Sequence, residues 1–230
     1  MADITVNGPD GQFSAYVAEP KATPAPGLLV IQEIFGVNQV MRDLCDQFAA
    51  RGYLAICPDL FWRLEPGVQL TDKTDAEWQK AFDLMGRFDV DTGIEDLKAT
   101  LHHVRGMENC TGLAGSVGYC LGGKLAYLMA TRSDADCTVA YYGVGIDQLV
   151  GEAKNINRPL LMHMATEDRF VPKEAQQTML DNLQEHPFVT IYVYEGNDHA
   201  FAREGGEHYD PEAAEQANKR SLDFLRQHLS

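Results

Sequence analysis

The chain has 230 residues, enough for one domain with a full hydrophobic core, and its apolar content of 45% is ordinary for a globular protein. Its 34 acidic and 19 basic residues give a formal net charge of −15, which argues against binding to nucleic acid or to an anionic membrane surface. No apolar run approaches the roughly 18 residues of a membrane span.

The start of the chain and the spacing of its cysteines set further expectations. Met1-Ala2-Asp3 shows no basic segment followed by an apolar run, so we expect a cytoplasmic protein. The five cysteines have no paired short spacing, which favours free thiols in a reducing compartment. No pair of histidines has a metal-ligand spacing on one helix face, so no metal site is expected. The sequence leaves the oligomeric state open, with a monomer favoured.

The first half of the chain alternates predicted strands with predicted helices. Weak alternation over residues 3–20, around Gly8-Pro9-Asp10-Gly11, predicts an antiparallel hairpin at a sheet edge. A near-continuous apolar run follows, as expected for a strand covered by helices on both faces. In this half we expect strands at 27–32 and 53–57, and helices at 39–51, 75–88 and 91–105. On the 75–88 helix, Phe82 and Met85 share one face.

The second half continues the same alternation. The last helix begins with Asp210 as N-cap and Pro211 at its first position, and it runs to about His228. The other expected elements are strands at 113–117, 137–142, 159–165 and 188–194, and helices at 124–130 and 172–183. Together the elements predict an α/β fold in one domain of residues 1–230. Its single, mostly parallel sheet has an N-terminal antiparallel edge hairpin and helices on both faces.

The stretch Gly118-Tyr119-Cys120-Leu121-Gly122 lies between a predicted strand and a predicted helix. A nucleophile flanked by glycines at a strand-to-helix turn is the elbow of serine hydrolases, here with a cysteine in place of the serine. The glycines let the strand and the helix approach closely around a strained residue. The backbone N–H of Leu121, at the helix start, would then be an oxyanion-hole donor. The bland alternative is a buried, inert cysteine in a glycine-rich turn.

An acid and a histidine follow two later predicted strands. Asp168 comes after the strand at 159–165, and His199 comes after the strand at 188–194. Nucleophile, acid and histidine in this chain order are typical of α/β-hydrolases, whose sites form at the carboxyl ends of parallel strands. We therefore predict a catalytic triad of Cys120, Asp168 and His199, in which His199 takes the thiol proton. Glu167 and Asp198 are neighbouring carboxylates that compete for the acid role.

Several longer motifs resemble the dienelactone hydrolase (carboxymethylenebutenolidase) family. They are Gln32-Glu33-Ile34-Phe35-Gly36, Gly118-Tyr119-Cys120-Leu121-Gly122-Gly123, Tyr141-Tyr142-Gly143-Val144-Gly145 and His199-Ala200-Phe201-Ala202-Arg203. The resemblance covers nearly the whole chain and implies an α/β-hydrolase fold. It also implies that a Cys-His-Asp triad hydrolyses a lactone or ester through a thioester acyl-enzyme.

The resemblance assigns roles to further residues. It implies that Glu33 binds the resting thiol and moves away when substrate docks, which protects the thiol from oxidation because a nearby carboxylate disfavours the thiolate. It makes the backbone N–H of Ile34 the second oxyanion donor. The alternative for Glu33 is a surface carboxylate in a loop.

The resemblance also describes a substrate pocket that includes Phe35 and Tyr141. Of the two arginines that bind the substrate carboxylate in the family, one matches Arg203 and the other falls on Trp78. This departure favours a flatter, more apolar pocket and puts the substrate in doubt. Arg63 or Arg87 would have to supply the missing charge, if any residue does.

Three hypotheses about function follow. The first is a cysteine-dependent hydrolase of a small, carboxylate-bearing enol-lactone of the dienelactone type. The second is an esterase for neutral or aromatic small esters, which Trp78 favours. The third is a redox-sensing thiol protein on a hydrolase scaffold, in which Cys120 reacts with peroxide and the triad partners have no purpose. In the first two the partner is a small molecule, and no cofactor is implied because hydrolysis needs only water.

Overall fold

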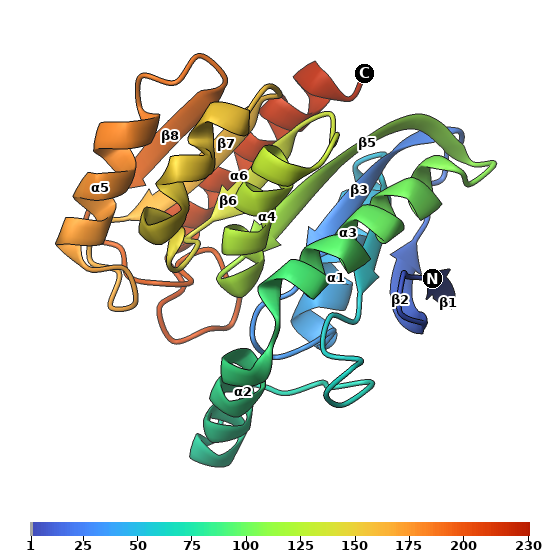
Figure 1. The fold of residues 1–230 in the computed structure, drawn as a ribbon, viewed down its shortest axis with the longest axis horizontal. Coiled ribbons are helices and arrows are strands. Elements are labelled where there is room, and N and C mark those ends of the chain that lie inside the picture. The colour runs from blue at the N-terminus through green and yellow to red at the C-terminus, as the bar shows by residue number, and fades with distance from the viewer. Residues whose placement is uncertain (1) are drawn as a thin grey trace. The chain divides into compact units, whose positions relative to one another are not determined.

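The computed structural model of the chain describes residues 2–230. The chain divides into two compact units, one ending at Ser116 and the other comprising Val117–Ser230, and the long strand β5 (Cys110–Tyr119) runs through the boundary. A single domain over residues 1–230 stays a prediction. Figure 1 shows the elements of both units.

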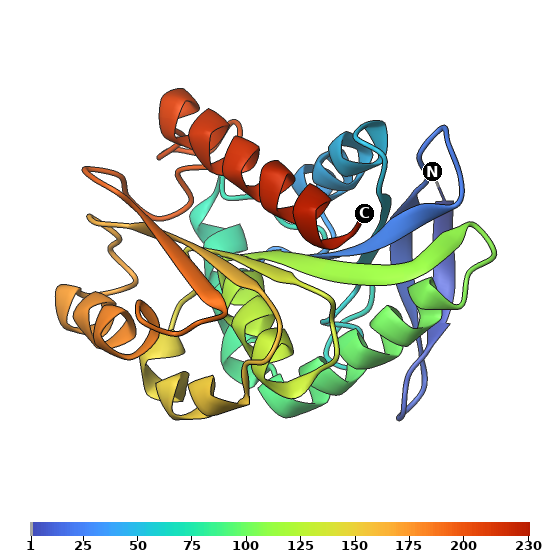
Figure 2. The ribbon, with the colours of Figure 1, turned by 90° about the horizontal axis from the view of Figure 1, so that it is seen from above.

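The first unit contains the N-terminal strands. Its elements are β1 (Ala2–Asn7), β2 (Gln12–Ala18), β3 (Ala25–Ile31), α1 (Gln39–Ala50), β4 (Leu54–Pro58), α2 (Asp75–Arg87) and α3 (Val90–Arg105). β1 and β2 form the predicted antiparallel hairpin, β2 pairs antiparallel with β4, and β4 pairs parallel with β3. Helices α1 and α3 lie on opposite faces of these strands (Figure 2).

The second unit contains the remaining strands, among which β6, β7 and β8 run parallel. Its elements after β5 are α4 (Leu121–Arg132), β6 (Thr138–Tyr141), the 3₁₀ helix η1 (Ile146–Asn155), β7 (Leu160–Ala165), α5 (Lys173–Leu183), β8 (Val189–Tyr194) and α6 (Pro211–His228). β6 pairs with β7 and β7 with β8. Figure 2 shows α6 on one face of these strands and α4 and α5 on the other.

The strand order is β1-β2-β4-β3-β5-β6-β7-β8. This confirms the predicted α/β architecture of a mostly parallel sheet with an antiparallel edge hairpin and with helices on both faces. Side chains at the predicted caps explain where the helices start. Asp210 Oδ1 accepts the N–H of Ala213 at 2.9 Å, with Pro211 at the first helical position. Among residues 2–230, no helix is long and apolar enough to cross a bilayer.

Two features of the fold differ from the sequence expectation. Helix α2 buries Ala81 and Leu84, whereas Phe82 and Met85, which share the predicted apolar face, are 41% and 37% exposed. The 3₁₀ helix η1 follows Gly145 and lies outside the predicted elements, although Ile146, Leu149, Val150 and Ala153 are at helical spacing. Gly151 in its interior weakens that signal, and Ile146 and Ala153 are its buried residues.

A buried polar network attaches α6 to the strands of the second unit. His163 of β7 is fully buried, and its Nδ1 lies 2.8 Å from Tyr194 Oη while its Nε2 lies 2.8 Å from Ser221 Oγ. Ser221 Oγ also lies 2.7 Å from Tyr141 Oη. Burial, with a smaller effect of the Arg220 charge, lowers the pKa of His163 to about 3. His163 is therefore neutral and links α6 to three strands.

We expect the free energy of unfolding to fall as pH is lowered below 6.5, with His163 contributing up to about 1.4 kcal/mol per pH unit. The unfolded chain takes up a proton at His163 near 6.5, its ordinary pKa, whereas the folded protein keeps it neutral down to about 3. Protons therefore favour the unfolded state in this window. Urea unfolding of wild type and His163→Gln between about pH 7 and about pH 5 measures the two slopes, and the variant's slope should be smaller.

The exposed His102 on α3 provides the control, because its substitution by glutamine should leave the slope at the wild-type value. Equal slopes in wild type and His163→Gln would show that His163 does not carry the pH dependence.

Candidate active site

Cys120 lies at a sharp turn between β5 and α4. Its φ is +57° and its ψ is −115°, a conformation that a residue with a Cβ adopts only under strain. Its N–H donates to the carbonyl of Tyr141 at 3.1 Å, which anchors the turn to β6. The Cys120 side chain is half-buried and caps nothing at the start of α4, where Leu121 is the first residue. The N–H groups of Gly123 and Lys124 donate to the Cys120 carbonyl, and the Cys120 side chain does not compete for the N–H of Leu121 at the helix start.

The glycines around Cys120 are required by close backbone contacts. A Cβ on Gly118 would lie 1.9 Å from the carbonyl oxygen of Gly122, and a Cβ on Gly123 would lie 2.3 Å from that of Tyr141. No side chain fits at either distance, so the strand, the turn and the helix can pack this closely only with glycine. The glycine spacing that the sequence shows is therefore a condition for the strained turn at Cys120.

His199 and Asp168 are hydrogen-bonded to each other in the second unit. His199 Nδ1 lies 2.9 Å from Asp168 Oδ2, and the side chains are 7% and 2% exposed. Asp168 Oδ1 accepts the N–H of Phe170 at 2.8 Å, which fixes the carboxylate. The rings of Tyr142 and Phe170 pack edge-on against the imidazole at 5.1 Å and 4.9 Å between centroids. These contacts hold the imidazole in one orientation.

The charge state of His199 depends on Cys120. Burial alone would lower the pKa of the imidazole, but the charge of Cys120, together with the charge and hydrogen bond of Asp168, outweighs it and raises the pKa to about 10. A thiolate at Cys120 and the carboxylate of Asp168 thus both stabilise the imidazolium. Because Nδ1 is directed to Asp168, Nε2 is the atom that can exchange a proton with the thiol.

The two carboxylates that compete with Asp168 have other contacts. Glu167 Oε1 pairs with Lys173 Nζ at 2.8 Å on the surface. Asp198 Oδ1 accepts the backbone N–H groups of His199 and Arg169. Of the three carboxylates, Asp168 is the one hydrogen-bonded to the imidazole. Sequence reasoning did not identify these backbone bonds of Asp198, since nothing in the pattern distinguishes it from Glu167.

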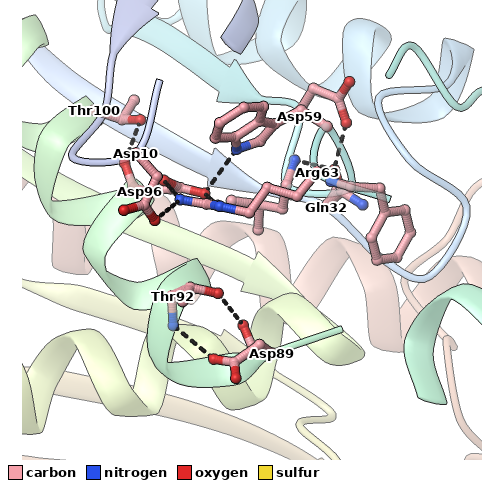
Figure 3. Close-up of polar contacts among 11 residues, drawn as sticks. Asp10, Gln32, Asp59, Arg63, Asp89, Thr92, Asp96 and Thr100 are labelled. Atoms are coloured by element: carbon pink, nitrogen blue, oxygen red, sulfur yellow. Dashed lines mark hydrogen bonds and ion pairs between the residues drawn. The ribbon is translucent and has the colours of Figure 1, made fainter. Parts of the chain in front are cut away.

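Glu33 and Ile34 follow β3 in the first unit, and both are buried. The side chain of Gln32, labelled in Figure 3, holds the backbone here. Its Nε2 donates to the Glu33 carbonyl at 3.2 Å, and its Oε1 accepts the N–H of Leu60 at 3.0 Å. Glu33 is only 3% exposed, so it is not the surface carboxylate that the alternative interpretation expected.

Trp78 belongs to an aromatic cluster within the first unit. Its ring meets Phe35 edge-to-face at 5.0 Å and stacks on Phe82 at 5.5 Å. Its Nε1 donates to the carbonyl of Asp72 at 3.1 Å. Phe35 is buried and Trp78 is half-buried, so position 78 is part of an apolar, aromatic surface.

Neither Arg63 nor Arg87 has a free guanidinium. Arg63 forms a salt bridge with the fully buried Asp96, pairs with Asp10 at 2.7 Å and stacks over the Trp62 ring at 4.3 Å (Figure 3). Arg87, on the exposed end of α2, pairs with Asp83 at 2.8 Å. Both charges are thus engaged by nearby acids, and Arg63 serves to satisfy a buried carboxylate.

Arg203 and Tyr141 are the remaining pocket candidates in the second unit. Arg203 is half-buried in a turn directly after the histidine, where its N–H donates to the Ala200 carbonyl at 2.9 Å. The hydroxyl of Tyr141 bonds Ser221 and Asn218 of α6 and is therefore directed away from the β6 end. A contact between Tyr141 and substrate stays a prediction. Among residues 2–230 no group of three or more His, Cys, Asp or Glu side chains could hold a metal ion.

Comparison with known sequences decides the family. A sequence profile of the dienelactone hydrolase family matches residues 13–229. The chain belongs to the dienelactone hydrolase family. It is 38% identical over 223 residues to carboxymethylenebutenolidase of Pseudomonas putida, covering 96% of this chain and 94% of that protein. It is 57% identical over 232 residues, the full length of both, to an Azospirillum brasilense protein that bears the same enzyme name provisionally.

A solved structure extends the comparison to the fold. The chain matches a Klebsiella pneumoniae protein, provisionally named a dienelactone hydrolase, with a TM-score of 0.86 at 28% identity, over 98% of each chain. This likeness confirms the predicted α/β-hydrolase fold, and membership of the dienelactone hydrolase family makes the protein a hydrolase.

Proposed function

We propose that this protein hydrolyses a lactone or ester bond with Cys120 as nucleophile, His199 as general base and acid, and Asp168 as the residue that orients His199. The leading substrate class is a carboxylate-bearing enol-lactone of the dienelactone type. The observation that supports this most directly is the strained, glycine-flanked Cys120 in the same unit as a buried His199–Asp168 hydrogen bond. The names of the relatives are consistent with it.

In the acylation step, His199 Nε2 takes the proton of the Cys120 thiol and the sulfur attacks the carbonyl carbon. The carbonyl π electrons move to oxygen, where the backbone N–H groups of Leu121 and Ile34 donate to the oxyanion. When the carbonyl re-forms, the bond from carbon to the ring oxygen breaks and the imidazolium protonates the leaving oxygen. The product of this step is a thioester on Cys120, with the opened substrate still attached.

In the deacylation step, His199 acts as a base toward water. The sulfur of a thioester carries no negative charge, so one of the two groups that raise the His199 pKa is lost and the imidazole can accept a proton. The water oxygen bonds to the acyl carbon as its proton passes to His199 Nε2. The carbon–sulfur bond then breaks, and the sulfur leaves and takes the proton back from His199, which restores the thiol and the neutral imidazole. Asp168 holds the imidazole in place through both steps.

Glu33 has a protective role in this proposal. Its carboxylate would bind the resting thiol and keep it protonated, because a second negative charge beside sulfur disfavours the thiolate. The burial of Glu33 supports a placement in the protein interior rather than at the surface. Displacement of this carboxylate by substrate would then release the thiol for attack.

A second substrate class is favoured by one observation. The cluster of Phe35, Trp78 and Phe82 is aromatic where the family has a second arginine, which suits a neutral or aromatic ester. With Arg63 and Arg87 engaged elsewhere, Arg203 is the arginine that would bind a substrate carboxylate.

Substitution of Arg203 by alanine tests which class is hydrolysed. For a dienelactone we expect kcat/KM to fall about 10- to 100-fold, the value of one charge-assisted contact, while hydrolysis of an uncharged aryl ester is unchanged. The measurement is steady-state hydrolysis of both substrates by wild type, Arg203→Ala and the exposed control Arg226→Ala.

Two other outcomes of this experiment would change the proposed substrate class or contradict the proposed function. Preference for the aryl ester, with no effect of Arg203→Ala, would replace the lactone by the neutral ester as the substrate class. No hydrolysis of either substrate by wild type would contradict the proposal for both classes and favour the redox-sensing alternative for Cys120.

A further inference from the structure

Asp198 precedes His199 in the chain, and its carboxylate joins the two loops that carry the proposed acid and base. Oδ1 accepts the N–H of Arg169 at 3.0 Å and the N–H of His199 at 2.6 Å. Oδ2 accepts Nε of Arg169 at 3.0 Å. A single carboxylate therefore holds the backbone of the residue after Asp168 and the backbone of His199 itself.

These bonds extend a series of contacts between the loops that follow β7 and β8. The series begins with three bonds: the N–H of Thr166 to the Tyr194 carbonyl at 3.1 Å, the N–H of Gly196 to Thr166 Oγ1 at 2.9 Å, and the N–H of Glu167 to the Asn197 carbonyl at 2.8 Å. The Asp168–His199 bond and the Asp198 bonds come next along the two loops. The loops thus stay paired past the end of the strands as far as the proposed triad.

The carboxylate of Asp198 is well suited to this position. Burial alone would raise the pKa of Asp198, but the backbone N–H groups of Arg169 and His199, together with the Arg169 guanidinium, outweigh it and lower the pKa. Asp198 is thus charged at neutral pH. Two other titratable groups interact with it. His208 Nδ1 lies 3.8 Å from Asp198 Oδ2, and its ring also contacts Arg169. The Glu167 carboxylate, paired with Lys173, has a weaker repulsion with Asp198. Because Arg169 follows Asp168 and Asp198 precedes His199 in the chain, the cluster of Asp198, Arg169 and His208 lies next to the Asp168–His199 bond.

We propose that Asp198 is a positioning residue for hydrolysis: by binding the backbone N–H groups of Arg169 and His199, it fixes the distance and angle between the Asp168 carboxylate and the His199 imidazole. The proposal rests on the proposed roles of Cys120, His199 and Asp168. Asp198 acts through the backbone of two loops rather than on substrate. An imidazole that is misplaced by about 1 Å transfers protons poorly, with losses of up to about 100-fold.

Two substitutions at Asp198 separate its hydrogen bonds from its charge. Asp198→Ala removes the three hydrogen bonds and also the ion pair between Asp198 Oδ2 and Arg169 Nη2 at 2.9 Å. We expect kcat to fall about 10- to 100-fold with KM changed less than about 3-fold. Asp198→Asn keeps an oxygen that can accept both backbone N–H groups but loses the bond from Arg169 Nε, and we expect a loss of only about 3-fold. Partial rescue by asparagine is the signature of a role in positioning.

Two further readouts do not depend on any substrate. The proton on His199 Nδ1, seen by NMR as a far-downfield signal, should broaden in Asp198→Ala and reappear in Asp198→Asn. Alkylation of Cys120 by iodoacetamide at about pH 7, followed on the Cys120 peptide by mass spectrometry, should slow about 10-fold in Asp198→Ala, because a misplaced imidazole accepts the thiol proton poorly. Glu167→Gln is the matched control, since it neutralises the adjacent, surface-paired carboxylate without touching either loop bond.

The outcomes distinguish this inference from the proposed function. If wild type hydrolyses neither lactone nor ester while the NMR and alkylation effects appear, the function is wrong and the positioning role of Asp198 stands. Wild-type kcat, NMR signal and alkylation rate in a folded Asp198→Ala would overturn the inference, as would equal losses in Glu167→Gln. If Asp198→Ala does not fold, Asp198→Asn carries the test. A fall in kcat of about 10-fold or more in that variant, with an unchanged Nδ1 signal, would overturn the inference, because the charge of Asp198 and not its backbone hydrogen bonds would then be responsible.

Discussion

Replacement of Cys120 by alanine is expected to lower kcat for the hydrolysed lactone or ester by about 10⁴-fold or more, because no other group on the strained turn can attack the carbonyl carbon. The fold should survive, since alanine is smaller than cysteine and the φ of +57° at this position is imposed by the glycine contacts around it. The measurement is steady-state hydrolysis together with thermal unfolding of the same sample.

Cys110 supplies the matched control for this substitution. It is the other cysteine that is not fully buried among residues 2–230, and its sulfur bonds backbone groups of its own turn, the N–H of Gly112 and the carbonyl of Leu113. Cys110→Ala should therefore retain wild-type kcat. In addition, mass spectrometry of acid-quenched wild type should show a thioester adduct on the Cys120 peptide, and no adduct in Cys120→Ala. Turnover within about 10-fold of wild type in a folded Cys120→Ala would exclude the thioester mechanism.

Most of the fold could be predicted because apolar runs and capping residues are local signals. The run Pro159–Ala165 predicts β7 within one residue, and Asp210-Pro211 predicts the start of α6 without error. Where such signals are weak the prediction fails. The segment η1 has apolar residues at helical spacing, but it contains Gly151, a poor helix former, and forms a 3₁₀ helix. The exposed side of α2 carries Phe82 and Met85, which periodicity alone cannot distinguish from a buried face.

Some contacts of the candidate site could also be predicted from local sequence signals, and others could not. Chain order and strand ends predict that Asp168 and His199 meet, and the structure has them hydrogen-bonded at 2.9 Å. The strain at Cys120 could be expected from the glycines of the elbow, because their spacing reports the close backbone contacts directly. Catalytic roles for these residues remain proposals.

The supporting contacts of the site could not be predicted from the sequence. The bond between Asp198 and the N–H of Arg169 joins residues that belong to two different loops, and it depends on loop geometry that no periodic pattern encodes. The same is true of Arg63, whose salt bridge with Asp96 removes it from the list of substrate-binding candidates. Side chains that bind backbone or buried charge in irregular segments leave no signature at fixed spacing.

Replacement of Asp168 by asparagine is expected to lower kcat by about 10³- to 10⁴-fold with little loss of stability. Asparagine keeps an oxygen for the N–H of Phe170, so the loop should hold its shape. Its amide N–H₂, however, would face His199 Nδ1 and favour the tautomer with the proton on Nε2. An imidazole with its proton on Nε2 cannot accept a proton from the Cys120 thiol, and both chemical steps stop at that point.

The pKa of His199 provides a second measure of the same substitution. Asp168 is one of the two groups that raise this pKa to about 10, so its removal should lower the pKa measured by NMR titration of the imidazole. Glu167→Gln, which alters the preceding carboxylate but no contact of His199, should leave both kcat and this pKa at the wild-type values. If Asp168→Asn lowered kcat without changing the His199 pKa, Asp168 would be acting on the loop through Phe170 rather than on the imidazole. A fall in kcat together with a fall in the His199 pKa is the result expected if the Asp168 carboxylate binds the imidazolium directly.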